Sequence, residues 1–565
     1  MTTIRRDVSA KSMQADATDV NDVSTPEPNQ RAAALTLVLL SAAVFLTALD
    51  QTVVATALLP IANSFDLPFQ NYLPQLSWIV SGYLLGYVIV MPLMGRVSDI
   101  YGRRRLLIGC LTLFGVASLL CSLATSLGNA FPLTFLERLG INSPAPALTW
   151  MVIARFIQAI GGGAVVPIAI AAIGDLYGSK RRILALGIIG GVTEAGGALG
   201  PLYGAIIVQK WPLLPHMFDQ TWQWIFLLNI PLVILIVGAL LLFWPRHAIA
   251  STTQSPSQRR IDWWGAAILG GSLLCLSVGL GQEASVISTV NNNNVTASQN
   301  NPILIGAAII LLGVFILAEA RQKEPVVDLS LFRSRAFSAG AIYSLFLGIS
   351  LIVALIDIPA FVFAVFNTTA YLDAGLALLR MTIMIPIGAF AGGWLVTRYG
   401  CRPVGIAGAF ITATGFFLMH HWGANVSWTE ITIGTMITGL GFGLIVAPIS
   451  TTALNTASPQ RFGMAASIST ALRIIGMILG LAGLSSWGLS RVQDLTIQAR
   501  QGIDLSNPDQ LNILSQRLVD VAIHVITDFY LVGGIVALLA VIPAFFLWKP
   551  AAGTKTDVAT FSMDL

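Results

Sequence analysis

The chain has 565 residues, of which 55% are hydrophobic and only 10% are charged, and its mean hydropathy is +0.78. These values exclude an ordinary soluble protein, in which roughly a quarter of the residues are charged. The net charge of +4 is too small and too dispersed for a nucleic-acid-binding surface. We therefore expect an all-α integral membrane protein.

The first 31 residues are polar and lack an apolar run beside their charges, which predicts a disordered cytoplasmic tail at 1–31 and no cleaved signal peptide. Beyond this tail, fourteen apolar segments are each long enough to cross a hydrocarbon core of about 30 Å, which takes about 20 helical residues. The predicted spans are 32–60, 75–97, 104–126, 148–173, 183–208, 222–244, 262–281, 302–320, 337–366, 374–396, 403–422, 429–454, 463–489 and 527–548.

Most of the 31 Lys and Arg residues lie in the N-terminal tail and in alternate loops, which the positive-inside rule assigns to the cytoplasm. We therefore predict that both termini are cytoplasmic, with a second tail at 550–565. No organelle-targeting segment is visible, so we expect a multi-pass protein of the plasma membrane.

Predicted span one contains Asp50, and span five contains Glu194. A charged side chain in the centre of a membrane costs about 2.5 to 3.5 kcal/mol on insertion scales, so each carboxyl must be paired, hydrated or protonated. We interpret Asp50 and Glu194 as residues that bind the coupling proton or contact the substrate. The alternative is that they only hydrogen-bond to a neighbouring helix as part of its packing.

Between spans two and three lies the turn Gly95-Arg96-Val97-Ser98-Asp99-Ile100-Tyr101-Gly102-Arg103-Arg104-Arg105. This pattern resembles the signature of the loop between spans two and three in the major facilitator superfamily, which implies transport. We expect a charge network here that holds one access state closed, and the alternative is that the arginines only set the topology. The predicted latch consists of Gly95, Asp99, Gly102, Arg103 and Arg104.

Arg155 in span four carries a permanent positive charge within the membrane, so it needs a carboxylate, a water molecule or a backbone carbonyl as partner. A nearby arginine favours the ionised form of a carboxyl group, so movement of Arg155 would load or expel a proton. The alternative is a purely structural ion pair. In span five, Gly200 and Pro201, together with Gly196 and Gly204, form a candidate hinge, because proline removes a helix hydrogen bond and glycines permit close packing.

Four segments resemble the fourteen-span drug:proton antiporter family of the major facilitator superfamily. They are Leu49 to Pro60 in span one, Arg155 to Gly163 in span four, Gly196 to Ala205 in span five and Trp222 to Pro231 in span six. The segments depart from the family pattern at Ala159 and Ala205, where glycine is commoner. The resemblance implies a secondary exporter driven by protons, without another cofactor, and associates Arg155 with proton transfer.

The chain also contains an internal repeat, because Gly393 to Arg402 matches Gly95 to Arg104 at the first glycine, the Tyr-Gly pair and the last arginine, although Thr397 replaces the aspartate. We therefore predict a major facilitator fold of two six-helix halves, 32–244 and 337–549, with a two-helix insert at 262–320. Parallel halves of this kind enclose a substrate site near the middle of the membrane.

Asp357 in span nine and Arg380 in span ten lie about 15 Å and about 10 Å below the outer turn that joins these spans, at 1.5 Å per residue. We predict that they pair, either as an external gate or as a substrate contact, and the alternative is a static clamp between helices. Arg473 in span thirteen is a third intramembrane arginine, and the sequence identifies no partner for it.

We expect an exporter of small amphipathic or cationic compounds in exchange for protons, working as a monomer in contact with membrane lipid. The alternatives are an exporter or flippase for an endogenous metabolite or lipid and, from another class, a non-transporting sensor or scaffold. The sequence has no nucleotide-binding loop, zinc motif or nucleophile turn, which argues against ATP hydrolysis and against an enzyme. The four cysteines have no metal-ligand spacing, and we predict no metal site.

Overall fold

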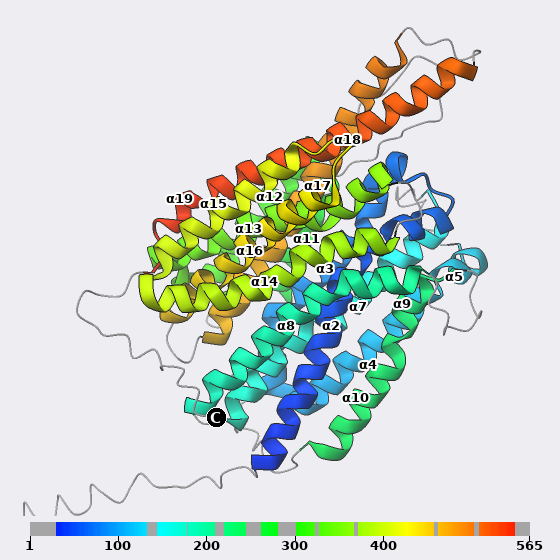
Figure 1. Cartoon of the computed structure of the whole chain (residues 1–565). Helices are drawn as coiled ribbons and strands as arrows, with labels where there is room; N and C mark the ends of the chain where they lie inside the picture. The colour runs from blue at the N-terminus through cyan, green and yellow to red at the C-terminus, as the bar shows by residue number, and fades with distance from the viewer. Residues whose placement is uncertain are drawn as a thin grey trace, which may run out of the picture.

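The computed structural model shows an all-helical protein built of two helical bundles that lie side by side (Figure 1). It describes residues 30–132, 144–177, 179–209, 220–244, 262–280, 301–322, 327–366, 371–456, 462–501 and 508–548. The two predicted tails lie outside these residues, apart from the last two positions of the first.

The first bundle corresponds to the predicted N-terminal half. Its helices are α2 (Gln30–Ser64), α3 (Phe69–Tyr101), α4 (Arg103–Ser122), α5 (Ala124–Ala130), α7 (Pro146–Leu176), α8 (Ser179–Val208), α9 (Gln223–Leu227) and α10 (Asn229–Phe243). Helix α2 packs along α8, and α3 and α4 both pack on α7.

The predicted insert contains α11 (Trp263–Leu280) and α12 (Pro302–Arg321), which pack on each other and reach the first bundle through α3. The second bundle begins with the short 3-10 helix η2 (Leu329–Arg333). It continues with α13 (Arg335–Phe366), α14 (Tyr371–Tyr399), α15 (Cys401–His420), α16 (Trp428–Thr456), α17 (Phe462–Arg500), α18 (Pro508–Leu539) and α19 (Val541–Ala544).

We call the end that carries the turns at Gly102 and Gly400 the inner end, since these turns are predicted to face the cytoplasm, and the opposite end the outer end. Both glycines have positive φ, 90° and 87°, which glycine adopts without the steric penalty of a side chain. The matched turns thus support the predicted repeat.

The bundles meet through α8 against α14 and α3 against α17. Near the outer end the contact of α8 with α14 is close, because a Cβ added at Gly375 would meet the Ala205 methyl group, and the Leu372 amide donates to Gln209 Oε1 at 3.0 Å. At the inner end the bundles separate: the start of α2 and the end of α14 lie far apart in Figure 1. The molecule is closed at its outer end and open at its inner end.

Eleven helices in the described residues are long and apolar enough to cross a membrane, and two shorter apolar helices cover Gln75–Met91 and Trp263–Gly279. The prediction of an all-helical membrane protein is confirmed. Helices lie over the predicted segments, but the count of fourteen spans and the division into six, two and six helices stay predictions.

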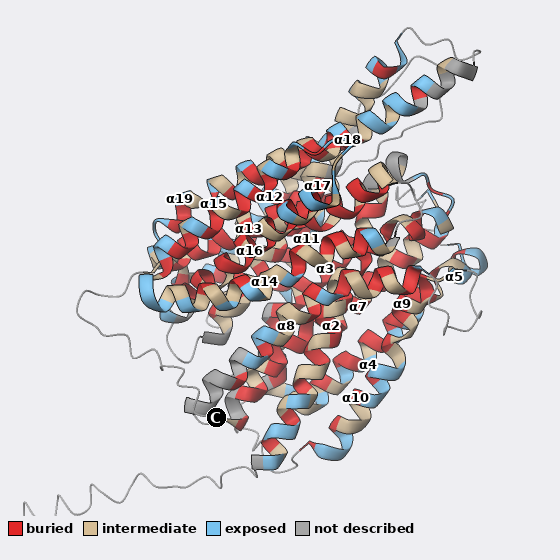
Figure 2. Ribbon diagram, viewed as in Figure 1, coloured by how far each residue is buried: buried red, intermediate tan, exposed pale blue. Residues whose placement is uncertain are grey.

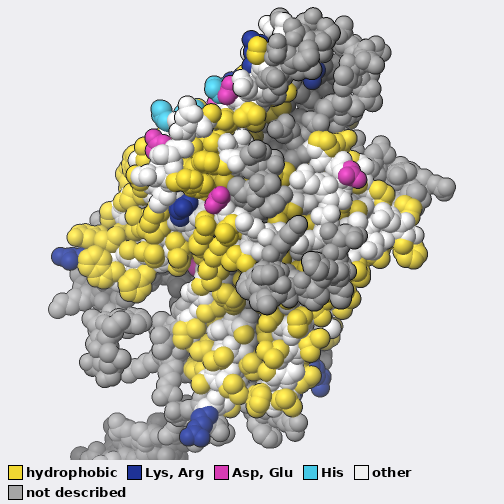
Figure 3. Space-filling view, turned by 45° about the vertical axis from the view of Figure 1, so that its right-hand side comes forward, with side chains coloured by type: hydrophobic (Ala, Val, Ile, Leu, Met, Phe, Trp, Pro, Cys, Tyr) yellow, Lys and Arg dark blue, Asp and Glu magenta, His cyan; other side chains and the backbone are white. Residues whose placement is uncertain are grey.

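Buried residues gather where helices of a bundle face each other, and the outward faces are exposed (Figure 2). Apolar side chains cover much of the flank (Figure 3). Phe390 is 82% exposed and Trp264 is 80% exposed. Large apolar side chains exposed in this way are unfavourable in water but suit a surface in contact with lipid.

The last two helices are longer than the predicted spans 463–489 and 527–548. Helix α17 runs to Arg500 and α18 starts at Pro508, and both extend beyond the other helices at the outer end (Figure 1). The 39 residues of α17 measure about 58 Å at 1.5 Å per residue, more than the ~30 Å core requires. The extension is polar, so a search for apolar runs did not detect it.

Candidate functional site

The most deeply buried polar cluster lies inside the first bundle, around Asp50 on α2. Arg155 Nη1 on α7 donates to Asp50 Oδ2 at 2.7 Å, and both side chains are only 1% exposed. Gln158 Nε2 donates to Asp50 Oδ1 at 3.1 Å, and Asn229 Nδ2 donates to the same oxygen at 2.8 Å. Three donors from two other helices therefore converge on one carboxylate.

The cluster continues away from the carboxylate. Arg155 Nη1 also donates to Gln158 Oε1 at 2.6 Å, and Gln158 Nε2 donates to Ser118 Oγ at 2.7 Å. The Arg155 guanidinium carbon lies 4.0 Å from the centre of the Tyr83 ring, which adds a cation–π contact. These contacts explain how a permanent charge is held inside a membrane bundle.

The predicted residues Asp50 and Arg155 are thus brought together, whereas Gln158, Asn229 and Ser118 were missed as partners. A signal was available for two of them. Gln158 lies one turn after Arg155 in the span-four segment, and Asn229 lies in the span-six segment that resembles the family pattern. Both are amides in otherwise apolar helices, where a polar group needs a partner.

Glu194 does not join this cluster. Its Oε1 lies 3.5 Å from Nη1 of Arg473 on α17, so the two residues bridge the two bundles. Their side chains are 24% and 23% exposed, which means that water reaches the pair. The structure therefore supplies the partner for Arg473 that the sequence did not identify.

Asp357 and Arg380 do not meet, so the predicted pair is wrong for this conformation. The Arg380 guanidinium on α14 lies 5.3 Å from the centre of the Trp428 ring on α16. Asp357 on α13 instead lines a small cavity with residues of α17 and α18. The two residues lie at similar depths in the membrane, but they face different neighbouring helices. The depth of a residue along its helix does not determine which neighbour it faces.

At the inner end, Arg103 Nη1 donates to Ser98 Oγ at 2.8 Å, and Arg104 Nη2 donates to the Leu241 carbonyl near the end of α10 at 2.7 Å. In the second bundle, Arg402 Nε donates to the Leu547 carbonyl, just beyond α19, at 2.8 Å. Equivalent arginines of the repeat therefore bind carbonyls at the last helix of each half, where a cation is favourable. Of the predicted latch residues, the surroundings of Gly95 and the side chain of Asp99 lie outside what the structure describes.

The predicted hinge glycines of α8 form the contact with α2. Cβ atoms added at Gly196, Gly200 and Gly204 would meet the backbone of α2. Thr52 Oγ1 donates to the Gly197 carbonyl and Thr56 Oγ1 to the Pro201 carbonyl, each at 2.9 Å. Helix α8 is continuous across Pro201, so these residues act as a tight interlock in this conformation.

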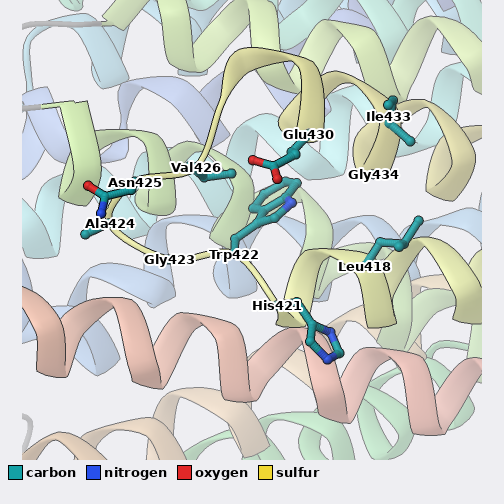
Figure 4. A pocket seen from close by; sticks show the side chains of 10 residues that line it. All are labelled: Leu418, His421, Trp422, Gly423, Ala424, Asn425, Val426, Glu430, Ile433 and Gly434. Carbon is teal, nitrogen blue, oxygen red and sulfur yellow. The ribbon is translucent and has the colours of Figure 1, made fainter.

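Two hollows lie away from these charges. The first measures about 520 Å³ at the outer end, between α15 and α16, and the side chains of His421, Trp422 and Glu430 line it (Figure 4). The second, of about 340 Å³, lies between α3, α7 and α11 and is lined by apolar groups that include Trp78, Phe156 and Leu274. Neither holds a metal-ligand set, and the described residues contain no group of three or more His, Cys, Asp or Glu that would hold a metal ion.

Comparison with known proteins identifies the family of this chain. The model of the Major Facilitator Superfamily matches residues 40–481. A triacylglyceride transporter of Mycolicibacterium smegmatis is 31% identical over 515 residues, which are 88% of this chain and 84% of that protein. A triacylglyceride transporter of Mycobacterium tuberculosis is 32% identical over 491 residues, which are 84% of this chain and 86% of that protein.

Solved structures agree on the fold. A bacterial homologue of the human lysosomal transporter Spinster, in an inward-facing and occupied conformation, has a TM-score of 0.60 with 15% identity and covers 92% of this chain and 99% of its own. A D-xylose–proton symporter has a TM-score of 0.57 with 15% identity, covering 91% of this chain and 98% of its own. The chain therefore belongs to the major facilitator superfamily and is a multi-pass membrane transporter.

Proposed function

We propose that this chain is a proton-coupled exporter of neutral lipids of the triacylglyceride class, working by alternating access of its two halves. The lipid assignment rests on the relatives that are 31% and 32% identical over most of the chain, which are named triacylglyceride transporters. The apolar hollow of about 340 Å³ between α3, α7 and α11 supports it, because such a surface suits an acyl chain better than a charged compound.

The buried Asp50–Arg155 pair is the observation that carries the coupling. In this conformation both oxygens of Asp50 accept hydrogen bonds, from Arg155, Gln158 and Asn229, and acceptance at both oxygens favours the ionised carboxylate over the protonated form, which needs an acceptor for its O–H. A proton on Asp50 would remove its charge and weaken the pair with Arg155. We therefore assign the inner-open state to deprotonated Asp50. Asp50 takes up its proton in the outer-open state.

The Glu194–Arg473 pair restrains the movement of the two halves relative to each other. A lipid that passes between the bundles must part α8 from α17, and this ion pair joins them at 3.5 Å. Protonation of Glu194 would release Arg473 and remove one restraint on that separation. In this proposal the ion pair between Glu194 and Arg473 forms again after the substrate has left.

Drug:proton antiport is the second candidate. It is favoured by the four segments that resemble the fourteen-span drug:proton antiporter family, and the same charges would serve it with a different cavity lining. An endogenous metabolite is the third substrate class.

One experiment separates these candidates. The purified chain is reconstituted in liposomes with an imposed pH gradient, and lumenal pH is recorded with the movement of a triacylglyceride that carries a fluorescent acyl chain. A panel of cationic dyes is tested in parallel. Wild type is compared with Asp50→Asn and with the control Asp66→Asn, which changes an exposed carboxyl just beyond the end of the same helix.

We expect lipid movement that releases protons in wild type and in Asp66→Asn and that is lost in Asp50→Asn. Proton release with dyes alone would replace the lipid assignment by drug antiport. Lipid movement that persists in Asp50→Asn would move the proton site elsewhere. Movement of neither substrate would leave export of an endogenous metabolite.

We also propose that fourteen spans form halves at 32–244 and 337–549 with an insert at 262–320, with both termini in the cytoplasm of a plasma-membrane monomer. Two short apolar helices and eleven longer ones support the high span count. A cytoplasm-dependent fluorophore fused at Leu565 should be bright, and a dark fusion would contradict the even count. Light scattering in detergent measures the oligomeric state.

A further inference from the structure

Asp357 is a second buried carboxyl group, in the other half of the protein from Asp50. It lies on α13 and is only 6% exposed. It lines a cavity of about 20 Å³ whose other walls are apolar side chains from α13, α17 and α18, among them Ile356, Leu481, Leu484 and Phe529. Within the described residues, its carboxylate makes no hydrogen bond and no ion pair.

This environment requires the neutral form of Asp357. An ionised carboxylate buried without a partner is strongly unfavourable, and such a group becomes protonated instead. The cavity of about 20 Å³ is otherwise lined by apolar side chains, so its walls offer no side-chain donor to a negative charge. The contrast with Asp50 is sharp, since Asp50 accepts hydrogen bonds from three donors.

Four charged groups on the helices packed against α13 contact residues other than Asp357. Tyr530 on α18 is a titratable neighbour of Asp357, and its buried hydroxyl has no hydrogen-bond partner among the described residues. Arg473 pairs with Glu194, Arg491 pairs with Asp528 at 3.3 Å, Glu430 accepts from Ser427, and Arg380 lies against Trp428.

An aromatic cluster separates Asp357 from the outer end. The ring of Tyr530 lies 5.5 Å from that of Trp422, and the Phe361 ring lies 5.0 Å from Trp422. Trp422 in turn lines the outer hollow of about 520 Å³, where Figure 4 shows it between the loop and the first turn of α16. The cluster therefore stands between this outer hollow and the carboxyl group.

We propose that Asp357 is a proton-binding site filled from the outer side, and that the outer end closes only when this site carries a proton. Closure buries the carboxyl behind Trp422 and Tyr530, so only its neutral form is compatible with the closed packing. Opening of the outer end admits water and allows the proton to leave. This site deepens the proposed proton coupling, on which its role in transport rests.

The test measures closure directly on the purified full chain in detergent, without substrate. Spin labels are attached to Asn63→Cys on α2 and Thr429→Cys on α16, which are exposed at the outer ends of the two halves. The four native cysteines are replaced by alanine, and transport by this background is checked first. Pulsed electron–electron distances then report the ratio of closed to open molecules as a function of pH.

Asp50 is proposed to lose its proton in the same outer-closed state, so its titration opposes that of Asp357 and is removed by Asp50→Asn. In the Asp50→Asn protein we expect the closed fraction to fall as pH rises, with the ratio changing about tenfold per pH unit when the states differ by one proton. Asp357→Asn added to this protein leaves a permanently neutral side chain and should keep the outer end closed at every pH. Asp528→Asn in the same background, the control on a carboxyl already paired with Arg491, should follow Asp50→Asn.

A pH-independent Asp50→Asn protein overturns the proposal, and so does a double variant of Asp50→Asn and Asp357→Asn that follows Asp50→Asn. If the double variant does not fold, infrared spectra of the Asp50→Asn protein replace it: the carbonyl band of a protonated carboxyl must disappear over the pH range in which the outer end opens. A failure of proton-driven lipid movement appears only in the liposome assay, so the two proposals fail separately.

Discussion

Arg473 on α17 and Glu194 on α8 form the one ion pair that joins the two halves in the part of the chain that the structure describes, with 3.5 Å between Nη1 and Oε1. Each residue belongs to a helix that faces the other half. The pair is about a quarter exposed, so its contribution to stability is small, about 0 to 1 kcal/mol, and its importance lies in the state that it favours.

Reversing the two charges tests this pair. We expect Glu194→Gln and Arg473→Gln each to reduce transport about tenfold while the melting temperature changes little, because the restraint between the halves is lost but little stability is. The double variant Glu194→Arg with Arg473→Glu should recover part of the transport. Flux in proteoliposomes measures this, and a double variant no better than Glu194→Arg alone would count against direct pairing.

Loss of Arg155 should destabilise the fold more than loss of Asp50. Arg155→Gln leaves the Asp50 charge buried without its ion-pair partner, which typically costs about 3 to 5 kcal/mol. Asp50→Asn retains an acceptor and removes the charge. We expect a lower melting temperature for Arg155→Gln, and partial recovery when it is combined with Asp50→Asn. Thermal unfolding in detergent measures both, and equal losses for the two single variants would contradict the argument.

Arg155→Lys should not rescue this site. The planar guanidinium donates to Asp50 and Gln158 from the same Nη1, and its carbon lies 4.0 Å from the centre of the Tyr83 ring. A lysine ammonium is a point charge with a different reach, so it cannot reproduce these contacts together. We expect transport by Arg155→Lys to stay below about a tenth of wild type, and near-normal flux would show that charge alone suffices.

The glycine contact between α8 and α2 gives a matched pair of variants. A Cβ at Gly200 would meet Thr52 Oγ1 and the Leu49 carbonyl, whereas a Cβ at Gly197 would meet nothing within 4 Å. We expect Gly200→Ala to lower the melting temperature and the flux, because α8 must move away from α2. Gly197→Ala should leave both nearly unchanged, and equal effects of the two would contradict the predicted interlock.

The turn at Gly102 gives a second matched pair. Its φ of 90° disfavours any other residue, although a Cβ there would meet no atom within 4 Å. We expect Gly102→Ala to destabilise by about 1 kcal/mol through backbone strain alone. Gly109→Ala, inside α4 and also in open space, should be neutral or stabilising by up to about 1 kcal/mol. Melting temperatures that fall equally for both would remove the conformational explanation.

Much of the fold was predictable because a bilayer imposes a simple rule. Apolar runs of about 20 residues must be helices, since every backbone polar group in lipid has to be paired within the chain. The equivalent turns at Gly102 and Gly400 were also visible in the sequence, as a repeat of the Tyr-Gly pair and the arginine. The outer extensions of α17 and α18 were not, because helices in water need no apolar run.

The sequence by itself determined that this protein is helical, lies in a membrane and resembles a transporter family, and it singled out Asp50, Arg155, Glu194, Arg473 and Asp357 as charges that need an explanation. Only the tertiary structure decided which charges meet. Asp50 meets Arg155 within one half, Glu194 meets Arg473 across the halves, and Asp357 meets no charge among the described residues. The physical reason is that hydropathy reports the depth of a residue along a helix, whereas pairing depends on which face of the helix it occupies and which helix packs there.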